Sequence, residues 1–262
     1  MRRLSEVVRA NAIARLATMI AAIDPPARTG RPRVWATLTM LQALWWLCRA
    51  GAVWSLLPKV YPPRQTIDSR LERWVRLTVL DRALAVLNRC LRLARGRTSR
   101  PTAGILDTQS VRTGPQHGPR GYDAAKKIKG RKRVLLVDTE GLIQGLRVVP
   151  ASIQDRDAAA VLEPELASGS LLKVWADLGF NGEGPATLMT RHDIDLELVG
   201  RKNKKGFVVE PRRWKVEQTF GCLQRYRRLL VDHEGRTERS RTMTLLASLF
   251  MTSARFERQI SP

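Results

Sequence analysis

Residues 134–150 read VLLVDTEGLIQGLRVVP, and the fold class is inferred outward from this stretch. The apolar run VLLVD leads into TEG at residues 139–141, after which LIQGLRVVP is again mostly apolar. Two apolar runs joined by a short polar turn that contains Gly are typical of a β-hairpin. The run AGILDTQSV at residues 103–111 predicts a strand before the hairpin, so three strands follow one another in the chain.

The segments after the hairpin alternate between helix and strand. Further elements are predicted at residues 155–167 (helix), 171–177 (strand), 182–192 (helix), 196–200 (strand), 212–231 (helix) and 237–258 (helix). Three successive strands followed by this alternation predict an α/β (α+β) fold, in which a mixed sheet is flanked by helices.

The first hundred residues have a helical pattern. Apolar residues recur at helical spacing in residues 34–49 and again from Thr66 through Leu91, and the segment GAVWSLLPKVYPP at residues 51–63 breaks the helix between them. Arginines occupy the positions between the apolar residues of the second run. A helix, a break and a helix with a basic outer face favour a helix-turn-helix-like DNA-binding module. A helical bundle whose arginines are only solvated is the alternative.

These patterns divide the chain into three segments. We expect a helical DNA-binding domain at residues 1–96, a linker at residues 97–102 and a catalytic domain at residues 103–262. The linker contains RTSRP, after which the helical pattern changes to a strand pattern.

The charge of the chain points to a polyanionic partner. The 262 residues include 46 Lys and Arg but 24 Asp and Glu, which gives a formal net charge of +22, and 44% of the residues are hydrophobic. That hydrophobic content excludes a disordered basic tail, so a folded protein that binds nucleic acid is the simplest interpretation. Composition alone leaves a ribosomal or membrane-surface protein open.

The sequence predicts neither a membrane span nor a secretory signal. No uninterrupted apolar run is long enough to cross a bilayer, and charged residues interrupt the apolar N-terminal stretch. Three scattered cysteines lack zinc-binding spacing. We therefore expect reduced cysteines and a cytoplasmic location.

Three acidic residues stand where a metal site is expected. Asp107 falls at the end of the first predicted strand, Asp177 at the end of the fourth, and Glu217 in the helix after the fifth. Ligands of open α/β sheets bind at the strand ends, and three carboxylates suffice to hold two Mg²⁺ ions for phosphodiester chemistry. Other acids have simpler interpretations, because Asp138 falls in the hairpin turn and Asp155 at a helix start.

Several longer motifs occur in a fixed order along the chain. They are GRPR (30–33), WSLLP (54–58), LDTQSVRT (106–113), RGYDAAKKIKGRKRVLLVDTEGL (120–142), SIQDRDAA (152–159), WADLGFNG (175–182) and PRRWKVEQTFGCLQRYRRL (211–229). Together they resemble the transposases of the insertion-sequence-five family, within the insertion-sequence-four-like group. The resemblance covers about residues 28–255, whereas the first 27 residues do not match the usual start.

The resemblance implies a fold, a site and an activity. It implies an RNase H-like core whose Asp, Asp, Glu triad matches Asp107, Asp177 and Glu217, with two Mg²⁺ ions that Mn²⁺ can replace. It also implies cleavage and strand transfer at the ends of a bacterial insertion sequence. The expected partners are double-stranded DNA, both element ends and target, and a second copy of the chain assembled on that DNA. The expected location is the bacterial cytoplasm, in association with the nucleoid.

Basic residues near the triad are candidates for DNA contact. Arg213 matches the Arg of the family's Tyr-Arg-Glu-Lys pattern and lies one helical turn before Glu217, although a structural pair between the two is the alternative. Glu210 replaces the Tyr of that pattern and Gln224 its Lys. The other candidates, which are expected just before the second strand or on the Glu217 helix, are Lys126, Lys127, Lys129, Arg131, Lys132, Arg133, Arg225, Arg227 and Arg228. An exposed loop neutralised by counterions is the alternative for the first six.

Two other functions remain open from the sequence. A metal-dependent nuclease of the same fold would cut DNA without joining it. A DNA-binding relic or regulator would occupy the element ends without cutting.

Overall fold

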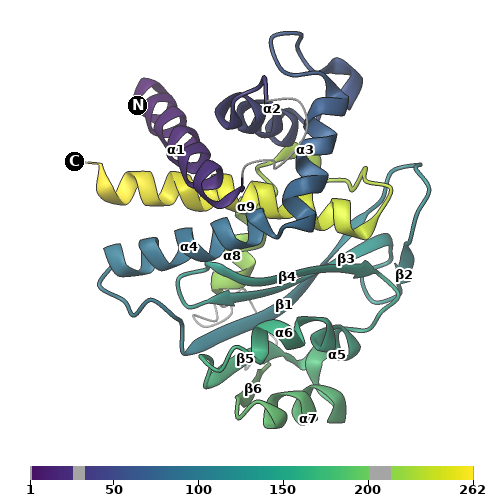
Figure 1. The fold of residues 1–262 in the computed structure, drawn as a ribbon. Coiled ribbons are helices and arrows are strands. Elements are labelled where there is room, and N and C mark those ends of the chain that lie inside the picture. The colour runs from purple at the N-terminus through teal and green to yellow at the C-terminus, as the bar shows by residue number, and fades with distance from the viewer. Residues whose placement is uncertain (1, 26–32, 201–213, 262) are drawn as a thin grey trace. The chain divides into compact units, whose positions relative to one another are not determined.

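The computed structural model describes residues 2–25, 33–200 and 214–261 of the chain (Figure 1). Two compact units are formed by different parts of the chain. Met1–Ser99, Arg225–Leu229 and Thr242–Pro262 form the first unit, and Arg100–Gln224 and Leu230–Arg241 form the second. The first change of unit thus falls inside the predicted linker at residues 97–102, while the second unit contains only part of residues 103–262. The functional division into a DNA-binding and a catalytic domain stays a prediction.

The N-terminal part of the first unit is helical, as predicted. Its helices are α1 (Arg2–Ile23), α2 (Thr37–Ala50), α3 (Arg64–Arg76) and α4 (Val79–Ala94). The prediction of one continuous run from Thr66 through Leu91 is wrong, because the chain turns at Leu77 and Thr78 between α3 and α4. Thr78 adopts a left-handed backbone with φ 50°, which apolar periodicity does not reveal.

A buried carboxylate holds the first unit together. Asp24 directly follows α1, and its carboxylate accepts hydrogen bonds from Trp74 Nε1 at 3.0 Å and Arg73 Nε at 3.1 Å. Arg33 and Arg70 also form ion pairs with it, at 2.9 and 3.4 Å. Burial by itself would raise the pKa of Asp24, but the hydrogen bonds from Trp74 and Arg73 and the charge of Arg33 hold that pKa below its usual value. The pairing fixes the end of α1 against α3.

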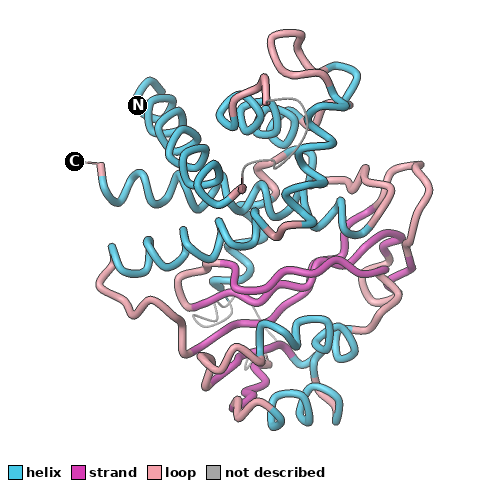
Figure 2. Tube along the Cα trace, in the orientation of Figure 1, coloured by secondary structure: helices cyan, strands magenta, loops and turns pink. Residues whose placement is uncertain are grey.

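The second unit is built on a mixed six-stranded sheet (Figure 2). Its strands lie in the order β2-β3-β1-β5-β6, and β4 pairs with β3 outside this path. Pairing is antiparallel for β1 with β3, β2 with β3 and β3 with β4, and parallel for β1 with β5 and β5 with β6. The strands are β1 (Ala103–Arg112), β2 (Gly121–Asp123), β3 (Ile128–Asp138), β4 (Ile143–Pro150), β5 (Lys173–Asp177) and β6 (Asp195–Val199). The predicted mixed sheet flanked by helices is confirmed.

The hairpin at residues 134–150 forms as predicted, but its first strand begins earlier. β3 starts at Ile128 rather than Val134, and the short β2 was not predicted. The basic stretch before residue 134 therefore belongs largely to a strand rather than to a loop. The sequence did not predict this strand because a run of cations is typical of an exposed loop. The acids that neutralise these cations come from other parts of the second unit.

Helices α5 to α7 cover one face of this sheet. The single helix predicted at residues 155–167 is wrong, because the segment consists of α5 (Asp155–Ala158), the 3-10 helix η2 (Ala159–Leu162) and α6 (Glu163–Leu166), the last with Pro164 in its first turn. α7 spans Glu183–Arg191. Side chains from these helices and from alternate strand positions, among them Leu106, Leu136 and Ala176, form one buried core.

The last helices complete the fold. α8 (Trp214–Leu223) packs on β1 and β3 and contributes no residue to the core beneath α5 to α7. A 3-10 helix, η4 (Arg227–Leu229), and the long helix α9 (Thr237–Ile260) follow. Among the described residues, no helix is both long and apolar enough to cross a membrane.

Candidate active site

Asp107 and Asp177 lie at the same level of two neighbouring parallel strands. β1 and β5 pair in register from Ala103 with Lys173 to Leu106 with Ala176. Asp107 and Asp177 are the next residues along these strands, and adjacent strands are about 4.8 Å apart. The parallel pairing therefore places together two acids that are 70 positions apart in the chain.

Both aspartates belong to the sheet face opposite α5 to α7. Leu106 and Ala176 point into the core beneath those helices. Because successive side chains of a strand alternate between the two faces, Asp107 and Asp177 point away from that core, toward the face on which α8 packs. Asp107 is 9% exposed, and its Oδ1 accepts a hydrogen bond from the backbone N–H of Thr108. Asp177 Oδ1 accepts one from the N–H of Gly179 at 2.9 Å.

α8 carries Glu217 in its first turn. The helix buries Val216, Thr219, Phe220 and Leu223, whereas Glu217 is exposed. Thr219 Oγ1 donates a hydrogen bond to Gly141 O at 3.1 Å, in the turn between β3 and β4. Gly141 has φ 72°, and a Cβ there would lie 2.9 Å from Thr219 Oγ1. The close approach of this turn fixes α8 on the sheet.

The donor atoms suit a divalent cation, but three acids are not gathered around one point. Carboxylate oxygens are preferred ligands of Mg²⁺, and Asp107 and Asp177 supply them from neighbouring strands. Across the residues that the structure describes, no group of three or more His, Cys, Asp or Glu side chains is arranged to hold a metal ion. The joining of Glu217 to the two aspartates stays a prediction.

A polar network lies directly behind Asp107. Thr108 Oγ1 donates to Asp155 Oδ1 at 2.9 Å, and Lys132 Nζ donates to the same oxygen at 2.6 Å. A Cβ on Gly179 would lie 2.9 Å from Asp177 Oδ1 and 3.1 Å from Asp155 Oδ2. Asp155 thus reaches from the residue after Asp107 to the loop that holds Asp177. Sequence reasoning assigned Asp155 only to a helix start and missed this link, which joins segments far apart in the chain.

The network continues to the start of β3. Ser110 Oγ donates to Asp123 Oδ2, and the backbone N–H of Lys126 donates to Asp123 Oδ1. Burial would raise the pKa of Asp123, but these hydrogen bonds and the charge of Lys132 hold that pKa below its usual value. Lys126 Nζ lies 3.3 Å from Thr108 O. Asp123 therefore stays ionised within a positively charged surrounding.

The six candidate cations around β3 divide into two groups. Lys126, Lys127 and Lys129 are exposed, so phosphate can reach them. The buried cations are Arg131, Lys132 and Arg133. Their side chains contact partners within the second unit. Because the three side chains are buried, nothing in the structure supports direct DNA contact by them, and that contact stays a prediction.

Arg131 shows what holds a buried cation. Its side chain is 2% exposed and forms an ion pair of 3.1 Å with Asp232. It also donates to the carbonyl oxygens of Pro119 at 2.8 Å and Glu234 at 2.6 Å. Burial lowers the pKa of Arg133 to about 10, against the opposing effect of Asp232, so the Arg133 guanidinium group remains charged at neutral pH. Arg131 and Arg133 thus stabilise the part of the sheet next to Asp232.

The remaining candidates lie elsewhere. Arg213 is outside the described residues. The predicted helix at residues 212–231 ends at Leu223, so Arg225, Arg227 and Arg228 do not share a helix with Glu217, which corrects that expectation. They belong to the first unit, where Arg228 is buried and donates to Ala52 O at 2.8 Å. Arg225 and Arg227 are exposed.

The turn interpretation of Asp138 is confirmed. Its Oδ1 accepts hydrogen bonds from the N–H groups of Glu140 and Leu142, each at 2.9 Å. This carboxylate closes the hairpin turn.

Two family models match the chain. A family model described as the transposase DDE domain matches residues 98–251. With the strand order of the sheet, this match defines an RNase H-like catalytic fold. A second model, described as a putative transposase of the IS4/5 family, matches residues 11–84. The chain belongs to the DDE transposases of the IS4/5 family.

The match to the IS4/5 family model extends further toward the N-terminus than the sequence motifs do. The second match begins at residue 11, which corrects the expected limit of the resemblance for residues 11–27, while residues 1–10 lie outside both matches. A comparison with curated proteins finds no match. Membership of this family makes DNA the partner of the chain and transposition its process.

Proposed function

We propose that the chain cuts the ends of an insertion sequence and joins them to target DNA, with Asp107, Asp177 and Glu217 as its catalytic carboxylates. One observation carries the assignment of the first two residues. They are level with one another on adjacent parallel strands, on the face where α8 packs, in a chain that belongs to the DDE transposases.

The three carboxylates would hold two Mg²⁺ ions, which Mn²⁺ could replace. When bound, such ions supply activation of an attacking oxygen and stabilisation of the leaving oxygen. In this proposal the protein itself holds the carboxylates in position. The strand pairing sets Asp107 beside Asp177, and the N–H of Gly179 orients Asp177. The packing of α8, which carries Glu217, on β1 and β3 supports its inclusion in the proposed site.

Exposed cations supply the affinity for DNA in this proposal. Lys126, Lys127 and Lys129 lie at the β2–β3 end of the second unit, and Arg225 and Arg227 belong to the first unit. Contacts with phosphate position a duplex without reading its bases. Assembly of two copies on DNA follows from the need to join two ends, and the bacterial nucleoid is the expected location of such a reaction.

A plasmid assay with matched variants tests this proposal. The substrate is a plasmid that carries the DNA flanking the gene, and cut ends and joined products are scored with and without Mg²⁺. Asp177→Asn should lose both products, while its carbonyl oxygen can still accept from Gly179. Asp157→Asn, an exposed acid in α5, is the control and should retain both.

The other outcomes separate the competing functions. Metal-dependent cutting without joining would favour a nuclease. Tight binding of the DNA with neither product would favour a regulator or an inactive copy. Equal cutting by Asp177→Asn and the parent would remove Asp177 from the site.

A further inference from the structure

A basic cavity lies at the end of the sheet where β1, β2 and β3 meet. It has a volume of about 380 Å³ and is lined by Arg112, Thr113, Arg120, Tyr122, Lys127 and Lys129. All six belong to the second unit. Arg112 is five residues beyond Asp107 on β1, or about 17 Å along the strand, so this cavity is separate from the candidate catalytic carboxylates.

The lining has a charge that calls for an anion. Four of its six residues are cations, all four are exposed, and none of the six is acidic. Arg120 donates to the carbonyl oxygen of Gln116 at 3.4 Å, a contact that leaves its charge uncompensated. Like charges gathered around one cavity repel one another unless a polyanion lies among them.

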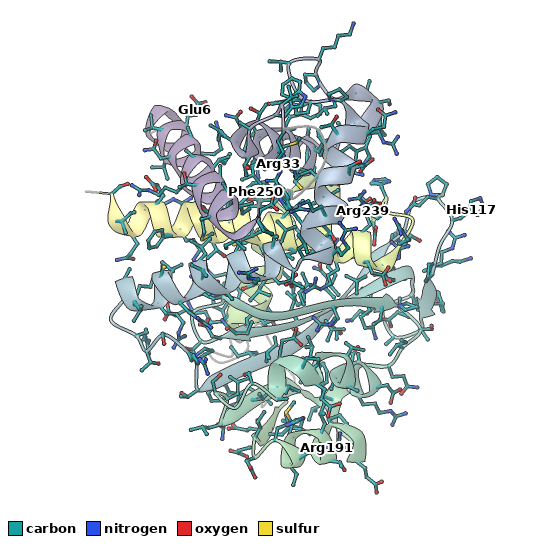
Figure 3. The ribbon with its side chains drawn as sticks, viewed as in Figure 1. Glu6, Arg33, His117, Arg191, Arg239 and Phe250 are labelled. Atoms are coloured by element: carbon teal, nitrogen blue, oxygen red, sulfur yellow. The ribbon has the colours of Figure 1, made fainter. Side chains whose placement is uncertain are left out.

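An aromatic ring is presented among these cations. Tyr122 is 55% exposed, which is unusual for a large side chain in a strand. It pairs directly with Lys129 across β2 and β3, so the ring and the ammonium group lie side by side on one face of the ribbon. The loop from β1 to β2, which carries His117, and the β2 ribbon lie at the same end of the unit (Figure 3).

The ribbon that carries the ring is held rigidly. Asp123, the next residue after Tyr122, is fixed by Ser110 and by the N–H of Lys126. Lys127 adopts a left-handed backbone with φ 54°. A Cβ on Gly130 would clash with the carbonyl oxygen of Val111, so only glycine permits this close approach of β1 and β3. The cavity is therefore shaped before any ligand binds.

We propose that this cavity binds an unpaired nucleotide of a DNA strand. Its phosphates would lie among Arg112, Arg120, Lys127 and Lys129, and its base would stack on Tyr122. Every base offers a face for such stacking only when it is not enclosed in a duplex. A staggered cut of the two strands of an element end leaves unpaired nucleotides, which would give the cavity a substrate about 17 Å along β1 from Asp107.

A binding experiment with the full-length chain tests the inference. Fluorescence anisotropy measures the affinity for a labelled 12-nucleotide single strand and for the same sequence as a duplex, both in EDTA. Tyr122→Ala should weaken single-strand binding by about five- to tenfold, since loss of base stacking has effects of this size. Duplex binding should change less than twofold, and Tyr122→Phe should retain both affinities.

Further variants separate stacking from folding and from charge. Tyr122→Leu keeps an apolar strand residue and should show the same selective loss as Tyr122→Ala. The plot of log K against log salt has a negative slope for the single strand. Lys129→Ala should make that slope less steep by about 0.7. Arg191→Ala, on α7 and away from the cavity (Figure 3), is the matched exposed cation and should change neither slope nor affinity.

Two results would overturn the inference. One is an equal loss of single-strand and duplex binding in Tyr122→Ala and Tyr122→Leu, which would reduce the cavity to a general phosphate surface. The other is unchanged single-strand binding in both. The inference rests on the proposed function only in taking DNA as the partner. Because binding is measured without divalent metal, failure to cut or join DNA and failure to bind the unpaired strand are separate results.

Discussion

Thr108 links the candidate catalytic strand to the network behind it. Its hydroxyl donates to Asp155 and lies 3.4 Å from Lys126 Nζ, while its backbone N–H donates to Asp107. Residues that orient a ligating side chain contribute to activity without touching the substrate. Thr108 therefore differs from the exposed cations Lys126, Lys127 and Lys129, because its contacts are with the candidate site and its surroundings.

Replacement of Thr108 by Val tests the positioning role. The change keeps the shape and the backbone N–H that donates to Asp107, but it removes the hydroxyl that ties β1 to Asp155 behind the site. DNA cleavage should therefore fall by roughly 10- to 100-fold while the affinity for DNA stays constant. Plasmid cleavage and anisotropy measure the two quantities. Thr187→Val, at an exposed position of α7, is the control. Equal cleavage by both variants would exclude the role.

Replacement of Arg131 by Met should destabilise the fold. The variant leaves Asp232 buried without its ion pair, and loss of one partner of a buried pair costs about 3–5 kcal/mol. Chemical denaturation of the variant and of Arg156→Met, which removes an exposed cation, measures the difference. A folded Arg131→Met protein with parental stability and weakened DNA binding would instead support direct DNA contact by Arg131.

The buried Asp24 should make stability fall in acid. Its pKa is lowered in the folded chain, so the ionised carboxylate favours folding. This contribution is complete above the unfolded pKa of about 3.9 and is lost as pH falls through the lower folded value. The free energy of unfolding of Asp24→Asn should therefore depend less on pH below about pH 4. An identical pH dependence of the two proteins would contradict this assignment.

At the scale of the element, the turn between β3 and β4 sets the position of α8. Gly141→Ala introduces a Cβ at φ 72° and 2.9 Å from Thr219 Oγ1. Gly169 has nearly the same φ, 70°, but nothing within 4 Å of an added Cβ. The pair of alanine variants therefore separates the contact with α8 from backbone strain.

Gly141→Ala should destabilise the protein more than Gly169→Ala does. Backbone strain alone costs about 1 kcal/mol, and displacement of α8 adds to that cost at Gly141 only. Cleavage should fall in Gly141→Ala because α8 carries Glu217. Thermal unfolding and the plasmid assay measure both effects. Parallel losses in the two variants would mean that the position of α8 does not depend on this contact.

The elements also show which sequence signals were sufficient. The hairpin at residues 134–150 was predictable because apolar runs and a glycine turn are local signals. The early start of β3 was not, because Lys132 and Arg131 become buried only through Asp155 and Asp232, which lie far away in sequence. The helix at residues 155–167 was predicted as one element, although its backbone divides into α-helical and 3-10 turns.

For the molecule as a whole, charge and motif order predicted the family, and topology explains the pairing of the aspartates. Asp107 and Asp177 were chosen as strand ends, and the parallel register of β1 and β5 brings them level. The arrangement of Glu217 was not predictable to the same degree, because a helix position fixes a face but not the reach of a side chain. The basic cavity at Tyr122 has no linear signature, since its lining comes from three strands and their connections.

The parallel pairing of β1 and β5 also determines when Asp107 and Asp177 can come together during synthesis of the chain. The ribosome completes β1 at Arg112, 61 residues before β5 begins at Lys173, and Glu217 emerges later still. Parallel pairs form only through such non-local contacts. A chain whose translation stops before β5 has no paired aspartates, so an incomplete product of the gene lacks this arrangement of acids.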